Sequence, residues 1–65
     1  MGMLITEFEV VVVGKYGDVE RTELCPSDLY AKDRVKYWES QGKQAIPNVK
    51  ITDYNKMEIR RYRID

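Results

Sequence analysis

Few residues in this chain could do chemistry, because its 65 residues include no histidine and only one cysteine. Histidine is the commonest general base and metal ligand, and it is the usual partner of a nucleophilic thiol. Cys25 precedes Pro26 just before a predicted helix, a position that can lower a thiol pKa. Because no histidine is present to act as its base, we interpret Cys25 as a small, semi-buried hydrophobic residue.

Two other patterns resemble chemical sites only superficially. The segment 14–17 holds two glycines and a lysine, but it lacks the Lys-Ser/Thr pair and the following helix of a phosphate-binding loop. Such a segment is typical of a hairpin turn. The acidic residues show no acid–base pair and no calcium-loop spacing. We therefore predict no catalytic residue, no metal site and no cofactor, and we expect a protein that is not an enzyme.

Basic and aromatic residues gather near the end of the chain, a combination that suits phosphate contact and base stacking. The candidate nucleic-acid contacts are Lys50, Lys56, Arg60, Arg61, Tyr62 and Arg63. The net charge is zero, yet residues 1–30 carry two basic and six acidic side chains, a net charge of −4. Residues 31–65 carry nine basic and five acidic ones, a net charge of +4.

Two explanations compete for this charge asymmetry. The basic strand could bind nucleic acid, or it could lie across the sheet from the acidic strands. Opposite charges paired across strands contribute about 0.2–1 kcal/mol each. The acidic residues available for such pairs are Glu7, Glu9, Glu20 and Glu23. Zero net charge favours the pairing explanation, because nucleic-acid binders usually carry a positive excess.

The elements that must position these residues begin with a strand at 4–13, where four consecutive valines follow Glu7 and Glu9. The two glutamates predict a solvated face near the start of that strand. A charged return strand is predicted at 19–24, where its charges would protect a sheet edge.

A helix is predicted at 28–41, with Ser27 or Asp28 as its N-cap and Gly42 after its end. Its apolar stripe consists of Ala31, Val35 and Trp38.

The C-terminal part of the chain predicts a second hairpin. Residues 44–47 read as a connector, 49–52 as a third strand and 53–56 as a tight turn. A fourth strand is predicted from 57 to 64, and its apolar residues change parity at Arg60–Arg61, which predicts a bulge there.

The predicted fold is therefore α+β: a single domain, residues 1–65, of order ββαββ, with a four-stranded antiparallel sheet and one helix packed on one face. The other sheet face would be uncovered, and an exposed apolar patch marks a candidate interface. Valines and an isoleucine point to that face, and two tyrosines on the helix are further candidates. The candidate interface residues are Ile5, Val11, Val13, Tyr30 and Tyr37.

These observations predict a small non-enzymatic protein–protein interaction module that binds a protein partner or itself as a homodimer. Nucleic-acid binding through the basic strand is the alternative. No apolar stretch approaches the roughly 20 residues that span a bilayer, so we expect a cytoplasmic protein with no membrane partner. Chains of this size and composition are common among phage and mobile-element accessory proteins, an association that rests on no motif. Met1-Gly2 reads as a cloning scar, although residues 1–6 match a myristoylation pattern.

Overall fold

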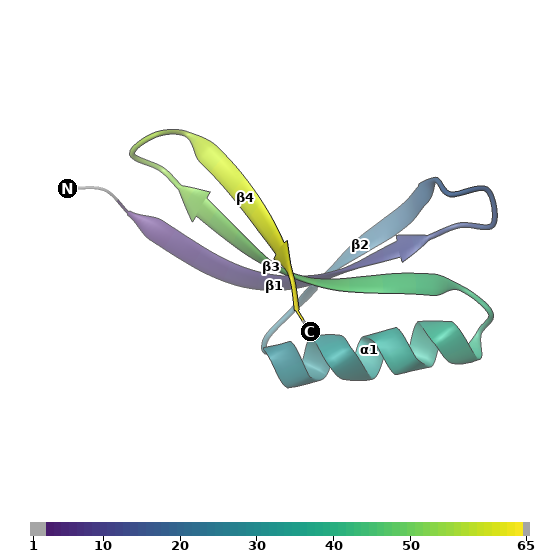
Figure 1. The fold of residues 1–65 in the computed structure, drawn as a ribbon. Coiled ribbons are helices and arrows are strands. Elements are labelled where there is room, and N and C mark those ends of the chain that lie inside the picture. The colour runs from purple at the N-terminus through teal and green to yellow at the C-terminus, as the bar shows by residue number, and fades with distance from the viewer. Residues whose placement is uncertain (1–2, 65) are drawn as a thin grey trace.

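The fold was analysed in a computed structural model that describes residues 3–64, so the predictions for Met1-Gly2 lie outside the described residues. Four antiparallel strands form one sheet in the order β2-β1-β3-β4, and one helix packs beneath it (Figure 1). This arrangement confirms the predicted α+β fold of order ββαββ. The elements are β1 Leu4–Val13, β2 Val19–Cys25, α1 Asp28–Ser40, β3 Gln44–Asp53 and β4 Glu58–Arg63.

The long antiparallel pair of β1 and β3 forms the centre of the sheet, and all ten residues of each strand are in register. Each outer strand covers only half of this pair. β2 pairs with β1 over Phe8–Val13, whereas β4 pairs with β3 over Asn48–Asp53. The outer strands therefore lie at opposite ends of the central pair, and the sheet has a diagonal outline.

The hydrophobic core lies between the helix and the half of the sheet that carries β2. Val10 and Val12 are 0% exposed, and they pack with Ala31 of the helix, also 0% exposed. Val35 and Trp38 are partly buried against the same cluster, as the predicted apolar stripe requires. Burying one valine side chain contributes about 1.5–3 kcal/mol, so Val10 and Val12 both contribute substantially to the stability of the fold.

The helix ends in a Schellman motif. Gly42 has a φ of +80°, a conformation that glycine adopts without steric cost. The amides of Gly42 and Lys43 donate to the carbonyls of Glu39 and Trp38, both at 3.0 Å. The predicted glycine cap is confirmed, and α1 stops at Ser40, one residue before the predicted end.

The predicted connector at 44–47 is wrong, because these residues are the first part of β3. Pro47 has no backbone N–H, yet it does not interrupt the strand. Its carbonyl accepts a hydrogen bond from the Ile64 amide at 2.9 Å, so its nitrogen also faces β4 and not β1. Proline therefore removes no bond from the central pair, and it lies where β4 stops.

The predicted bulge at Arg60–Arg61 is also wrong, because β4 keeps a regular register with β3. All residues of β4 are exposed, so its apolar side chains need not share a face. Ile59 and Tyr62 accordingly lie on opposite faces of the sheet. The sheet does contain one irregularity, and it lies where β2 pairs with Val12 and Val13 of β1.

The turn between β3 and β4 explains why β4 begins at Glu58 and not at Met57. The Asp53 carboxylate accepts hydrogen bonds from the amides of Asn55 and Lys56, at 3.0 and 3.2 Å. Met57 has a φ of +55°, a left-handed conformation that removes it from the strand. The side-chain type at 57 carries no signal for this conformation.

We expect Ser27→Ala to lower the free energy of unfolding by about 1 kcal/mol. The Ser27 hydroxyl is the N-cap, and it accepts a hydrogen bond from the Tyr30 amide at 3.1 Å. Urea denaturation followed by circular dichroism measures the loss. Ser40→Ala, at the exposed end of the same helix, is the matched control and should change stability much less. Equal losses in the two variants would show that the cap has no special role.

Candidate interaction surface

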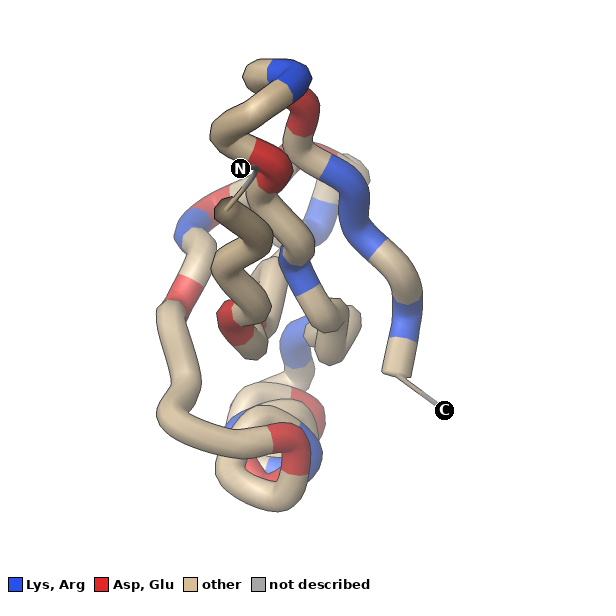
Figure 2. Tube along the Cα trace, turned by 90° about the vertical axis from the view of Figure 1, so that its left-hand side faces the viewer, with Lys and Arg blue, Asp and Glu red and all other residues tan. Residues whose placement is uncertain are grey.

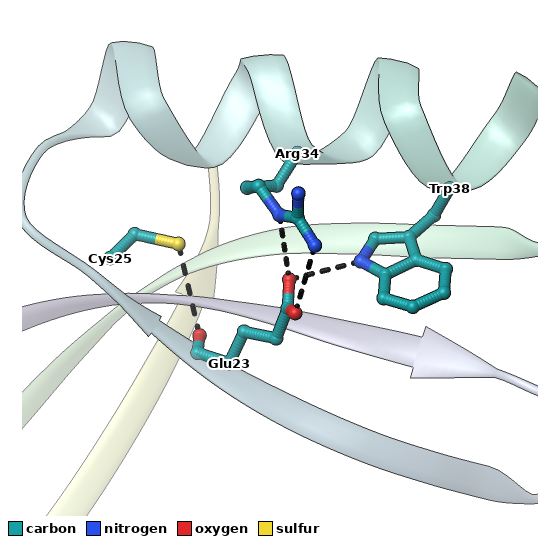
Figure 3. A network of polar contacts seen from close by, with 4 residues as sticks. All are labelled: Glu23, Cys25, Arg34 and Trp38. Carbon is teal, nitrogen blue, oxygen red and sulfur yellow. Dashed lines mark hydrogen bonds and ion pairs between the residues drawn. The ribbon is translucent and has the colours of Figure 1, made fainter.

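The partly buried carboxylate of Glu23 joins the helix to strand β2 (Figure 3). The two carboxylate oxygens of Glu23 accept from Nε and an Nη of Arg34, both at 3.0 Å. The Trp38 indole nitrogen donates to the same carboxylate at 2.9 Å. A guanidinium fork and an indole N–H therefore hold one acidic side chain between two elements. All three of these hydrogen bonds join parts of the same fold, so the cluster is structural.

The contacts in this cluster shift the pKa values of Glu23 and of nearby Cys25 in opposite directions. The Arg34 hydrogen bonds, followed by the Trp38 hydrogen bond, lower the pKa of Glu23 from its ordinary value of 4.5. Burial, followed by the negative charge of Glu23, raises the pKa of Cys25. A raised pKa keeps the thiol protonated at neutral pH and therefore unreactive. Cys25 is 8% exposed and belongs to the core, which confirms its interpretation as a small hydrophobic residue.

We expect the Glu23 contribution to stability to disappear in acid. A carboxyl group with a lowered folded pKa stabilises the fold fully above its unfolded pKa, and this stabilisation is lost as the pH falls through the folded value. Glu23→Gln should therefore be less stable than the unmodified chain at neutral pH, and the difference should shrink below about pH 4.5. Urea titrations across this pH range measure the difference.

The matched control for this prediction is Glu39→Gln, on an exposed part of the helix. It should leave the acid limb of the pH–stability profile as it is in the unmodified chain. A stability difference for Glu23→Gln that stays constant at every pH would contradict the prediction.

Two ion pairs lie in adjacent rows on the sheet face opposite the helix, and their four members are here called the charge quartet: Glu7, Glu9, Lys50 and Arg61. Arg61 Nε donates to Glu9 Oε1 at 2.7 Å, and Lys50 Nζ lies 4.0 Å from Glu7 Oε1. Glu9 is only 1% exposed, so the prediction of a solvated face is wrong at this position. Glu9 lies on a central strand, and the long side chain of Arg61 from β4 reaches its carboxylate diagonally across β3.

We expect Arg61→Ala to lower the free energy of unfolding by about 1–3 kcal/mol, because the Glu9 carboxylate would stay buried without its partner. Arg63→Ala is the matched control: it lies on the same strand and face, and among residues 3–64 it forms no ion pair. Its effect should be within about 0.5 kcal/mol. Chemical denaturation measures both values, and losses of the same size would contradict the importance of the Glu9–Arg61 pair.

The charge asymmetry of the sequence is largely neutralised inside the fold. The predicted pairing with the basic C-terminal segment is confirmed for Glu7 and Glu9. It is wrong for Glu20 and Glu23, which pair with Lys43 after the helix and with Arg34 on it. The sequence could not show this, because it is the packing of α1 against the sheet that brings Arg34 and Lys43 close to β2.

The six candidate nucleic-acid residues do not form one surface. Figure 2 shows basic residues gathered along β4, the strand that leads to the C-terminus. Their side chains alternate between the two faces: Lys50, Arg61 and Arg63 lie opposite the helix, whereas Arg60 and Tyr62 lie on the helix side. Lys56 lies in the turn. Lys50 and Arg61 belong to the charge quartet, and Arg60 forms an ion pair with Glu58 at 3.4 Å.

The five candidate interface residues also divide into separate groups. Ile5, Val11 and Val13 lie on the face opposite the helix, as predicted from their parity. The charge quartet separates Ile5 from the two valines, which are half-buried. Tyr30 and Tyr37 lie on the helix at 48% and 46% exposure, in the other layer of the molecule. The predicted valine patch is therefore interrupted by charge.

A different apolar surface lies where the sheet extends beyond the helix. Residues 3–7 and 50–62, here called the arm, form a three-stranded segment that projects away from α1 (Figure 1). Seven of the thirteen large apolar side chains that are exposed among residues 3–64 lie on the arm. They are Met3, Leu4, Ile5, Tyr54, Met57, Ile59 and Tyr62, at 37–81% exposure.

Both faces of the arm are hollowed. On the helix side, a hollow of about 260 Å³ is lined by Leu4, Ile51 and Tyr62 together with charged residues of β4 and its turn. On the opposite face, a hollow of about 230 Å³ is lined by Tyr54, Met57 and Ile59 beside Glu7 and Lys50. Of the apolar residues on this surface, sequence analysis singled out Ile5 as a candidate interface residue and Tyr62 as a candidate nucleic-acid contact. The others are scattered in sequence, and only the length mismatch between sheet and helix exposes them.

The described part of the chain holds no cluster of three or more histidine, cysteine or acidic residues that could bind a metal ion. None of its helices is long and apolar enough to span a membrane. Comparison with known protein families, curated proteins and solved structures finds no match to this chain.

Proposed function

We propose that this protein is a small, non-enzymatic protein–protein interaction module that binds through its arm. The observation that carries this proposal is the concentration of exposed apolar side chains on a sheet segment with no helix on either face. Exposed apolar side chains that gather on one part of a surface typically mark a protein-binding site. A reducing compartment such as the cytoplasm suits the single free thiol.

The physical argument concerns the stability of the arm itself. A three-stranded antiparallel segment needs an apolar face packed against something to be stable alone. The core of this protein lies at the other end of the sheet, so the arm is held only by its strands and the charge quartet. Covering Met57, 81% exposed, or Leu4, 67% exposed, would remove apolar area from water at about 25 cal/mol per Å².

The arm suits a protein surface better than a nucleic acid. Its cations on the face opposite the helix are matched by Glu7 and Glu9, so little positive charge is free to displace counterions from phosphates. The apolar residues beside them include methionine and tyrosine, which are enriched in protein interfaces. An accessory role in a phage or mobile element remains a prediction from size and composition.

A photo-activated crosslinker tests this function when placed at single positions of the full chain in the source cells. We expect Met57, at the tip of the arm, to give discrete protein adducts. Lys36, an exposed position on the helix, should give few. Adducts of equal yield from both positions, or none from Met57, would contradict the proposal. Adducts that nuclease treatment removes would favour the nucleic-acid alternative.

A further inference from the structure

The N-terminal half of β1 has a free edge. On one side it pairs with β3, but on the other side β2 pairs with β1 only from Phe8 onward, so Leu4–Glu7 has no strand partner there among residues 3–64. Figure 1 shows this half of β1 along the outside of the arm. A free strand edge is a template for pairing with another chain.

The backbone groups on this edge can be identified individually. The Tyr54 amide donates to the Met3 carbonyl at 3.0 Å, so the backbone of Met3 faces β3. Successive residues of a strand face opposite sides, so Ile5 also faces β3, whereas Leu4 and Thr6 face outward. Two N–H groups and two carbonyls, those of Leu4 and Thr6, therefore form the free edge.

This edge differs from the other exposed edges of the described sheet. The outer strands β2 and β4 carry charged side chains along their length, which discourage pairing. β4 leaves only the short start of β3 uncovered, and this part ends at Pro47, which has no N–H and whose carbonyl already accepts from the Ile64 amide. From Leu4 to Thr6 there is neither a charge nor a proline, and Leu4 and Ile5 are 67% and 37% exposed.

We propose that two copies of this chain pair antiparallel through this edge, with Ile5 opposite Ile5 of the second copy. This inference rests on the proposed function and names the partner of the arm. In this register Leu4 of each copy exchanges hydrogen bonds with Thr6 of the other, so all four free groups are satisfied. The two Ile5 side chains meet on the face opposite the helix, as a closely spaced pair that is not hydrogen-bonded.

Other symmetric registers satisfy fewer groups. A register with Thr6 opposite Thr6 places Leu4 opposite Phe8, where the edge is already taken by Cys25 of β2. A register with Leu4 opposite Leu4 places Thr6 beyond the start of β1 of the second copy. The self-complementary edge, with one residue at its two-fold axis, is what an isologous dimer requires.

The properties of the whole chain favour a second copy as the occupant. Its net charge is zero, so two copies do not repel each other. A domain of this size buries only about 60% of its unfolded surface, and association adds burial. The edge is small against the roughly 800 Å² per partner of a standard interface, so the dimer is weak, with a dissociation constant of roughly 10 µM to 1 mM.

Disulfide trapping tests the register in the full chain, with Cys25→Ser as background. Two residues at the proposed Ile5 position have Cα atoms about 4.5 Å apart, within the range of a disulfide. We expect Ile5→Cys to form a covalent dimer under mild oxidation, seen by mass spectrometry. Ile59→Cys is the matched control, on the same face, more exposed at 52% and away from the edge, and it should crosslink at least about tenfold less.

Two further variants separate edge pairing from misfolding. Thr6→Pro removes an N–H that faces outward, so it should keep the circular dichroism spectrum while lowering Ile5→Cys crosslinking about tenfold or more. Ile5→Lys opposes two ammonium groups at the two-fold axis. Sedimentation at increasing concentration should show a dimer for the unmodified chain and a monomer for this variant.

Equal crosslinking of Ile5→Cys and Ile59→Cys, or a dimer that Ile5→Lys leaves intact, would overturn the proposed register. No Ile5→Cys crosslink, together with Met57 adducts to other proteins, would overturn self-pairing while the interaction function stands. Failure of both the Ile5→Cys crosslink and the Met57 adducts would overturn both proposals.

Discussion

The structure depends on a mismatch of length between its helix and its central strands. A helix of 13 residues is about 20 Å long, whereas a strand of ten residues is about 33 Å long. One such helix covers only part of the β1–β3 pair, and the core, β2 and Glu23 all lie in that part. The other part becomes the arm, with apolar side chains on both faces. The molecule is accordingly elongated, with principal extents of 44 × 25 × 16 Å.

Ionised side chains supply connections that the small core cannot. Glu23 links the edge strand to the helix, and Glu9 links the central strand to β4. Each acidic group lies where its loss of hydration is compensated by charge-assisted hydrogen bonds. Among the described residues, no buried side-chain nitrogen or oxygen lacks a hydrogen-bond partner. The acidic residues of the first half of the chain therefore pair with basic residues of the second half, and these pairs stabilise the fold.

The same mismatch connects the fold to the proposed role. Because no helix covers the arm and β2 stops at Cys25, apolar surface and a free strand edge occur in one place. Either feature alone is common in small proteins. Together they provide both contact area and backbone hydrogen bonding, the two components of strand addition between proteins.

The sequence by itself determined the order and type of the elements. Valine-rich alternation, the serine before the helix and the glycine after it are local signals, and they depend on backbone sterics within a few residues. The effect of Pro47 on β3 depends on which neighbour its nitrogen faces, and the parity change at Arg60–Arg61 misled because an exposed strand needs no single apolar face. Only the tertiary structure decided the partners of Glu9 and Glu23 and the exposure of the arm. These depend on how far one helix reaches along a longer sheet, a distance that no local pattern in the sequence records.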